Sequence, residues 1–227
     1  MRKVLSLTCS LALGLFLFSC GGATEGTSET EDTSMNEETA ETEGPSGSYT
    51  LSQEESMLVW EGNMLKIGGV SIYGHAGTIA FQKGMMTMEN GKIVDGTFIV
   101  EMNTITPTDE EYNAEKGSTP EKLVGHLSSP DFFAVDSFPT ATFQVTGMEE
   151  GKIMGDMTIR GITNAETMEN VTMETMETMD GKVKATGSMT LDRQKYNVAF
   201  DLGAEDKVIS DDLDLEFTIV AVADVAM

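Results

Sequence analysis

Apolar and polar residues alternate along several separate runs of the chain. Every second residue from Val183 to Leu191 is apolar or small, and the same holds from Leu213 to Ala221. Successive side chains of a strand point to opposite faces, so this period predicts strands with one buried and one solvated face. Three earlier runs predict buried faces of the same kind: Ile79 and Phe81; Val94, Gly96, Phe98, Val100 and Met102; and Phe143 and Val145.

Turn signals separate these runs. Asn90-Gly91 and Asp180-Gly181 each lie between two predicted strands, and Glu150-Gly151 occupies a similar place with weaker turn chemistry. Asn-Gly and Asp-Gly suit tight hairpins because both central residues must take a positive φ. The pattern therefore predicts an antiparallel sheet wrapped around an apolar interior.

One segment differs from the alternating pattern. In residues 119–133, Thr119 is a suitable N-cap, Pro120 suits the first helical position, and Leu123 and Leu127 share one helix face. We expect one short helix here, preceded by a long polar loop over residues 103–118. The predicted fold is all-β, an extended antiparallel barrel of about eight strands; a sandwich fits less well, and the sequence leaves closure open.

The N-terminus resembles an export signal. Arg2 and Lys3 precede the apolar stretch Val4–Phe18, which is too short to span a bilayer. Residues 1–19 are predicted to be a lipoprotein signal peptide and Cys20 the lipidated residue, with Cys9 removed. An ordinary signal with an incidental cysteine is the alternative. The expected location is the bacterial cell envelope, lipid-anchored on the periplasmic face or the cell surface.

Residues 20–48 have a different composition, with eight acidic residues, no basic residue and very few apolar ones. Such a segment cannot bury enough surface to fold and predicts a flexible tether. The folded domain is expected over residues 49–227. The whole chain has a net charge of -24, which argues against nucleic acid as a partner. Contact with the membrane is expected only through the lipid anchor.

The sequence offers no recognisable catalytic motif. It has no G-x-S-x-G elbow, P-loop, G-x-G-x-x-G or H-E-x-x-H pattern, and only two histidines, His75 and His126. A zinc site would require both histidines together with a carboxylate, and their spacing does not indicate one. We therefore expect a protein that is not an enzyme, with no catalytic residues, no cofactor and no metal.

The chain contains 17 methionines. Thioethers bind Cu(I), so the clusters Met85–Met88 and Met173–Met179 raise a copper-carrier hypothesis. On a strand, however, Met173 and Met176 would point to opposite faces. The alternative is that methionine fills an irregular interior.

Several longer sequence motifs follow one another along the chain in a recognisable order. They are Trp60–Gly62, His75–Gly77, Glu101–Ile105, HLSSPDFF at 126–133, FPTATF at 138–143, GDMTIRGIT at 155–163, and Asp192-Arg193. Together they resemble the YceI-like family of lipocalin-like, polyisoprenoid-binding proteins over residues 49–227. The acidic tethered form is similar to anchored members from Bacteroidetes-type bacteria. The resemblance implies a barrel whose cavity holds an amphiphilic isoprenoid chain, such as a quinone or polyprenol.

The inward strand faces supply the expected cavity lining. The candidates are Phe81, Phe98, Val100, Phe143, Val145, Met157, Ile159, Met189, Leu191 and Phe217. Phe132 and Phe133 are expected to plug one end of the barrel, and His75 to cap the other end from a strand start. His126 is expected to contact a ligand head group or to pack, and Arg193 to pair with a carboxylate or to meet a ligand oxygen.

The expected function is non-catalytic carriage or sequestration of an isoprenoid or similar lipid, which is the only bound molecule expected. The alternative is a solid barrel whose acidic face binds a protein partner, as a surface or stress protein. The copper carrier is a third hypothesis. A homodimer is left open.

Overall fold

Eleven strands pair into one antiparallel sheet in the computed structural model, which describes residues 44–66, 68–110, 112–175, 181–200, 203 and 207–224. The elements in chain order are β1 (Gly47–Leu51), β2 (Met57–Lys66), β3 (Val70–Ile79), β4 (Phe81–Glu89), β5 (Lys92–Glu101), η1 (Met102–Thr104), β6 (Thr106–Pro107), η2 (Ala114–Lys116), α1 (Pro120–Ser128), β7 (Thr140–Glu149), β8 (Lys152–Ile159), β9 (Ile162–Thr175), β10 (Lys182–Asp192), η3 (Arg193–Tyr196) and β11 (Lys207–Ala223).

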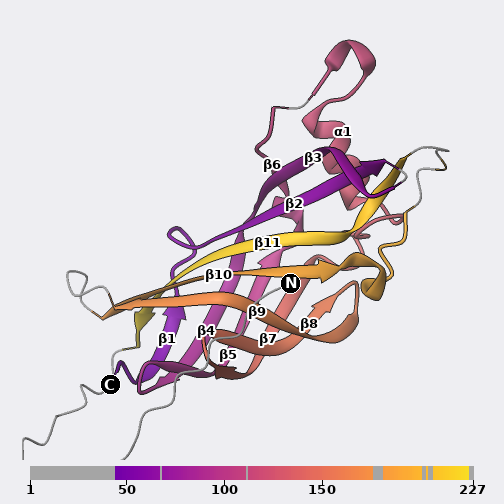
Figure 1. Ribbon diagram of the computed structural model, residues 1–227. Helices are drawn as coiled ribbons and strands as arrows, with labels where there is room; N and C mark the ends of the chain where they lie inside the picture. Colours follow the sequence, from indigo (N-terminus) through magenta and orange to yellow (C-terminus); the bar gives the residue numbers. More distant parts are fainter. Residues whose placement is uncertain are drawn as a thin grey trace, which may run out of the picture. The chain divides into compact units, whose positions relative to one another are not determined.

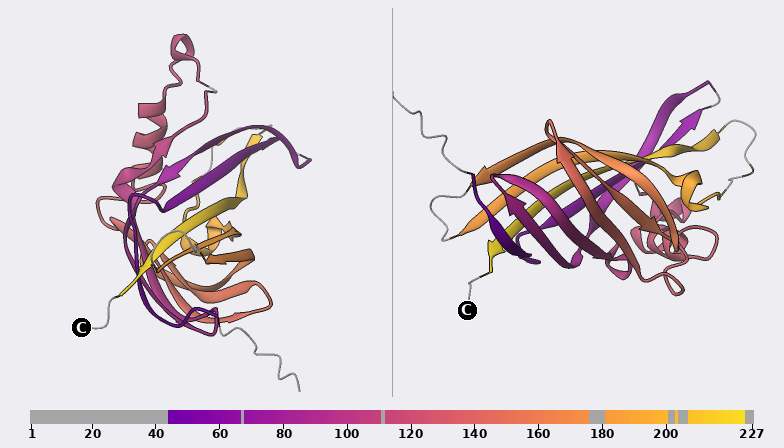
Figure 2. Two further views of the ribbon diagram at one scale, coloured as in Figure 1. Left: turned by 90° about the vertical axis from the view of Figure 1, so that its left-hand side faces the viewer. Right: turned by 90° about the horizontal axis from the view of Figure 1, so that it is seen from below.

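The sheet closes on itself through β1, which pairs with β4 on one side and with the end of β11 on the other. The ring runs β1-β4-β5-β7-β8-β9-β10-β11, so the fold is a closed eight-stranded antiparallel barrel with one short α-helix. This confirms the predicted fold class. β2, β3 and β6 continue the sheet from β11 beyond the closure, and Figures 1 and 2 show the β2–β3 hairpin diverging from the barrel.

The predicted hairpin turns lie where the sequence places them. Asn90-Gly91 joins β4 to β5 and Glu150-Gly151 joins β7 to β8, and all four residues have a positive φ. Gly181 directly precedes β10, whereas Asp180 lies outside the described residues. A further turn, Arg160-Gly161, joins β8 to β9 and was not predicted, because arginine is not a turn-forming residue.

Arg160 adopts a φ of 51°, which is strained for a residue with a long side chain. Its Nη1 donates to the carbonyl oxygens of Phe132 (2.5 Å) and Asn197 (2.6 Å), and its Nη2 donates to that of Pro130 (3.3 Å). These bonds offset the strain, and they join the α1–β7 connection to the segment that follows η3.

The inward faces of β10 and β11 are buried as predicted, including Met189, Leu191, Phe217 and Ile219. The prediction for β5 is wrong at its start. Val94 was placed on the inward face, but it is 40% exposed, whereas Ile93 is 2% exposed. The cause is an irregularity in the β4–β5 register between Thr87 and Met88, which shifts the alternation by one residue.

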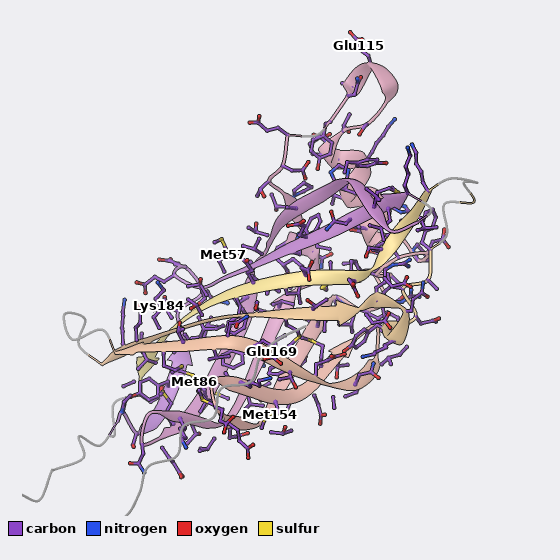
Figure 3. The ribbon with its side chains drawn as sticks, viewed as in Figure 1. Met57, Met86, Glu115, Met154, Glu169 and Lys184 are labelled. Atoms are coloured by element: carbon purple, nitrogen blue, oxygen red, sulfur yellow. The ribbon has the colours of Figure 1, made fainter. Side chains whose placement is uncertain are left out.

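The predicted short helix is confirmed as α1. The Thr119 hydroxyl accepts a hydrogen bond from the Lys122 backbone N–H (3.3 Å), and Pro120 occupies the first turn. Leu127 on the inner face is buried, while the preceding excursion carries Glu115 at a tip that projects away from the barrel (Figure 3). No helix among the described residues is long and apolar enough to cross a membrane.

The folded part includes residues 44–48 ahead of the predicted domain start. Gly91 donates its backbone N–H to the carbonyl oxygen of Pro45 (2.9 Å), and Asn90 donates to the Ser46 hydroxyl (2.8 Å). β1 then starts at Gly47. These contacts fix the beginning of the barrel against the β4–β5 turn.

Candidate ligand-binding cavity

An elongated cavity of about 150 Å³ runs through the barrel interior. Its lining follows β5 from Ile93 to Val100 and β8 from Ile153 to Ile159. At about 3.3 Å per residue, these stretches are about 23 Å and 20 Å long. The lining side chains are almost all apolar.

Aromatic rings line the cavity without filling its axis. A Cβ atom on Gly155 would lie 2.4 Å from Cζ of Phe143, and one on Gly187 would lie 2.4 Å from Cζ of Phe217. Each ring therefore lies flat over a glycine of the neighbouring strand, against the wall. Two more pairs show the same close approach: Phe98 over Gly84, and Trp60 over Gly77. The glycines thus keep the barrel axis open.

The structure brings thirteen of the fourteen predicted site residues to this cavity. They are Phe81, Phe98, Val100, Phe132, Phe133, Phe143, Val145, Met157, Ile159, Met189, Leu191, Arg193 and Phe217. Phe132 and Phe133 are both buried, and their rings contact each other edge to face at a centroid distance of 5.0 Å. They form part of the wall beneath α1.

His126 is the predicted residue that does not line the cavity. Its imidazole contacts Phe200 edge to face at 4.4 Å and Phe132 at 5.3 Å between ring centroids. Of the two expectations for this residue, packing is the one that the geometry supports. His126 holds the ring of Phe132, which itself lines the cavity.

Arg193 is buried, and its guanidinium is committed to the protein. Nε donates to the carbonyl oxygen of Ser210 (2.8 Å), Nη1 to that of Val198 (2.5 Å), and Nη2 to that of Ile209 (3.2 Å). Nη2 also forms an ion pair with the Asp211 carboxylate at 3.0 Å. Of the two roles expected from the sequence, the structural pairing is the one observed.

We expect Arg193→Lys to destabilise the barrel by about 2 kcal/mol, because an ammonium group cannot replace a planar fork that bonds three carbonyl oxygens. The Asp211 carboxylate is 59% exposed, so Asp211→Asn should cost about 1 kcal/mol or less. Urea unfolding measures both variants. Equal losses would show that the ion pair, and not the carbonyl contacts, carries the effect.

β11 is irregular where Arg193 holds it. Ile209 pairs with Met64 and Leu213 pairs with Gly62, so three residues of β11 face one residue of β2. Ser210, at the start of this bulge, and Asp212, at its end, line the cavity, and Asp212 is exposed. The cavity therefore reaches the surface at the β11 bulge, defined as Ser210–Asp212. Bulges often occur beside functional sites because they interrupt the wall of a sheet.

Trp60 lines the cavity. The sequence motif Trp60–Gly62 contributes to the family resemblance, but Trp60 was not predicted as a site residue. It is 6% exposed, and its Nε1 has no hydrogen-bond partner among the described residues. Trp60 pairs with Leu215 of β11, and Gly62 pairs with Leu213, the first residue after the β11 bulge. Trp60 therefore lies two residues further along the strands from the bulge, toward the barrel interior. Residues 58–62 (LVWEG) do not alternate strictly between apolar and polar, because Val59 is apolar as well. The sequence pattern therefore did not indicate that the Trp60 side chain points inward.

His75 lies in the middle of β3 and not at a strand start, and it does not line the cavity. Its Nδ1 lies 3.1 Å from Oδ1 of Asp109, and its ring stacks on Tyr112 at 5.0 Å. Oδ2 of Asp109 accepts from the Tyr112 hydroxyl (3.1 Å) and the Ala76 backbone N–H (3.1 Å). This cluster fastens the excursion before α1 to β3.

Burial, aided by the Asp109 carboxylate, raises the pKa of Tyr112 to about 12 from 10. Between these pH values the unfolded chain loses the phenol proton more readily than the folded one, so stability falls as the pH rises. Tyr112→Phe should reduce this alkaline loss. Urea midpoints measured from pH 9 to 12 test the prediction, and parallel curves for variant and wild type would contradict it.

A second buried polar pair lies beside η3. The Tyr196 hydroxyl donates to Oε1 of Glu166 at 3.0 Å, and Lys195 approaches the same oxygen at 3.8 Å. Burial, followed by this carboxylate, raises the pKa of Tyr196. Glu166 lies next to Gly155 across β8 and β9, so the inward face is polar where η3 covers it.

The described methionines of the two clusters lie in different surroundings. Met85 is 64% exposed, whereas Met86 and Met88 are buried in the core, and Met173 packs against that core. Met176 and Met179 lie outside the described residues. Within the described ranges, no group of three or more His, Cys, Asp or Glu side chains is arranged to hold a metal ion.

The fold and the cavity define a class: a closed antiparallel β-barrel with an elongated apolar interior that reaches the surface. A sequence model of the YceI-like domain matches residues 49–221. The chain therefore belongs to the YceI-like domain family. This finding agrees with the resemblance that the sequence motifs indicated.

Individual relatives cover less of the chain. The UPF0312 protein SAB2563 of Staphylococcus aureus (strain bovine RF122 / ET3-1) is 39% identical over 84 residues, which is 35% of this chain and 48% of that protein. The UPF0312 protein SAUSA300_2620 of strain USA300 gives the same values. The chain spans about half the length of the curated relatives it matches.

Two solved structures illustrate what this chain is similar to, and the first of them shares its fold at low sequence identity. The crystal structure of Burkholderia cenocepacia BcnA superposes with a TM-score of 0.55 at 16% identity, covering 76% of this chain and 99% of that one. A polyisoprenoid binding domain from Saccharophagus degradans, implicated in plant cell wall breakdown, gives 0.46 at 12% identity, covering 78% and 98%.

Proposed function

We propose that this protein is a non-catalytic binding protein that holds one amphiphilic isoprenoid chain, of polyprenyl or quinone type, for carriage or sequestration. The observation that carries the proposal is the elongated apolar cavity along the barrel. Each methylene group that moves from water into such a cavity contributes about 0.8 kcal/mol. A narrow cavity about 20 Å long suits a single extended chain better than a compact ligand.

Trp60 supports a ligand that carries an oxygen atom. Its buried indole N–H has no partner among the described residues, and an unsatisfied buried donor costs about 1–3 kcal/mol. A ligand oxygen that accepts this hydrogen bond would remove the cost. The ligand is therefore proposed to be amphiphilic rather than a pure hydrocarbon.

A binding role fits the lining better than a catalytic one. Arg193 and Asp212 are the charged residues among those that line the cavity, and the Arg193 donors are bonded to the protein. No nucleophile and base face each other among the lining side chains. The cavity also argues against the solid barrel considered as an alternative.

Trp60 provides a direct assay because it is the single tryptophan of the chain and lines the cavity. Titration with retinol, an isoprenoid alcohol whose absorption overlaps tryptophan emission, should quench Trp60 fluorescence with saturation at one molecule per chain. Geranylgeraniol should restore the emission by displacement. Quenching that rises linearly without saturation would argue against the proposed function.

We also propose that the chain is exported and anchored in the bacterial cell envelope through a lipid on Cys20. The support is the sequence of residues 1–48, most of which lies outside the described residues. Cys20→Ser should move the protein from the membrane fraction to the soluble fraction, whereas Cys9→Ser, inside the proposed signal, should leave it with the membranes. Membrane association of both variants would contradict the anchor.

A further inference from the structure

The cavity has polar lining only near one end. Its deep part, between the β4–β5 and β7–β8 turns, is lined by Ile93, Ile153 and Met168. Arg193, Ser210 and Asp212 line the other end, where the β11 bulge lies. A polar group that enters the apolar end without a partner loses its hydration and gains no hydrogen bond. An amphiphilic chain is therefore most stable with its tail in the deep end and its polar end at the bulge.

The charge at the bulge is negative. Asp212 lines the cavity and is exposed, and it faces Asp192 directly across β10 and β11. Arg193 does not balance both carboxylates, because its donors are held by three carbonyl oxygens and by Asp211. Lys207 lies on β11 ahead of the bulge, opposite Lys66, and Lys195 of η3 approaches the Glu166 carboxylate at 3.8 Å.

We propose that Asp212 sets the head-group specificity of the cavity: the barrel accepts isoprenoid chains with a neutral oxygen-bearing end and rejects chains that end in phosphate or diphosphate. The proposal rests on the proposed function, since it concerns the same cavity. A phosphorylated chain seated tail-first places its negative charge at the end of the cavity that Asp212 lines, and Asp192 adds a second negative charge across β10 and β11. A neutral alcohol or carbonyl meets no such repulsion.

The test compares two ligands that share one chain, geranylgeraniol and geranylgeranyl diphosphate, as displacers of retinol followed by Trp60 fluorescence. The wild-type protein should bind the alcohol at least about tenfold more tightly at physiological ionic strength. Asp212→Lys should reduce this ratio by about tenfold, and Asp212→Asn should reduce it by a smaller factor. Both variants change an exposed side chain and should fold.

Asp95→Lys is the matched control, because it makes the same charge change on the outer face of β5 near the opposite end of the barrel. It should leave the ratio within about twofold of the wild-type value, since charges that far apart are screened. A wild-type protein that binds the diphosphate as tightly as the alcohol overturns the inference. If Asp212→Lys and Asp95→Lys change the affinity ratio equally, the inference is also overturned, because the ratio then depends on the net charge of the protein and not on the position of Asp212. If neither ligand displaces retinol and retinol itself does not bind, the proposed function fails instead.

Discussion

Gly155→Val should destabilise the barrel by about 3 kcal/mol or more, the largest stability effect that we expect from a single substitution. A Cβ atom at this position would lie 2.4 Å from Cζ of Phe143 and 2.6 Å from the carbonyl oxygen of Gln144. The ring could move only toward the cavity axis, and the carbonyl belongs to the β7 backbone. Urea unfolding monitored by circular dichroism measures the loss.

Gly147→Val is the matched control on β7. A Cβ atom there would meet only the Met154 Cε atom, at 3.4 Å, an ordinary contact with a flexible side chain. We expect this variant to stay within about 1 kcal/mol of wild type. Similar losses for both valine variants would mean that glycine matters for the backbone of β7 and β8, and not for the position of the Phe143 ring.

Ala185→Phe should weaken chain binding by about two orders of magnitude while the barrel stays folded. Ala185 is 2% exposed and lines the cavity, so a phenyl ring there occupies space that the chain would fill. Excluding about four methylene groups removes about 3 kcal/mol of binding free energy. Because the ring enters existing space, the melting temperature should hold or rise. Retinol titration of Trp60 fluorescence gives the affinity.

Ala165→Phe makes the same change on the outer face of β9, where Ala165 is exposed. It should leave retinol affinity unchanged, which separates cavity filling from a general effect of added aromatic surface. If Ala185→Phe folds and binds retinol with wild-type affinity, the ligand lies outside the barrel, and the cavity is only a packing defect.

Much of the barrel was predictable because its strands alternate strictly and its turns use residues that accept a positive φ. Asn90-Gly91 is such a turn, and the inward faces of β10 and β11 follow directly from the period of two. The misplacement of Val94 and the β11 bulge both arise from register shifts. A register shift depends on the neighbouring strand, so one strand's own sequence does not reveal it.

The cavity itself was harder to predict than its lining. Alternation identifies inward side chains such as Phe143 and Phe217, but the same pattern is found in solid cores. Whether the axis stays open depends on Gly155 and Gly187 lying under those rings, a relation between strands. The cavity was expected because of the family resemblance. The pairing of Arg193 with a carboxylate was expected because burying an unpaired charge is costly.

The most direct test of the central claim is mass spectrometry of an organic extract from a fragment that starts at residue 42 and includes the barrel, purified without detergent from a bacterial periplasm. The cavity and its polar end predict a near-stoichiometric isoprenoid species with a neutral head group. A well-folded protein whose extract contains no lipid, and which does not take up retinol when it is offered, would contradict the account.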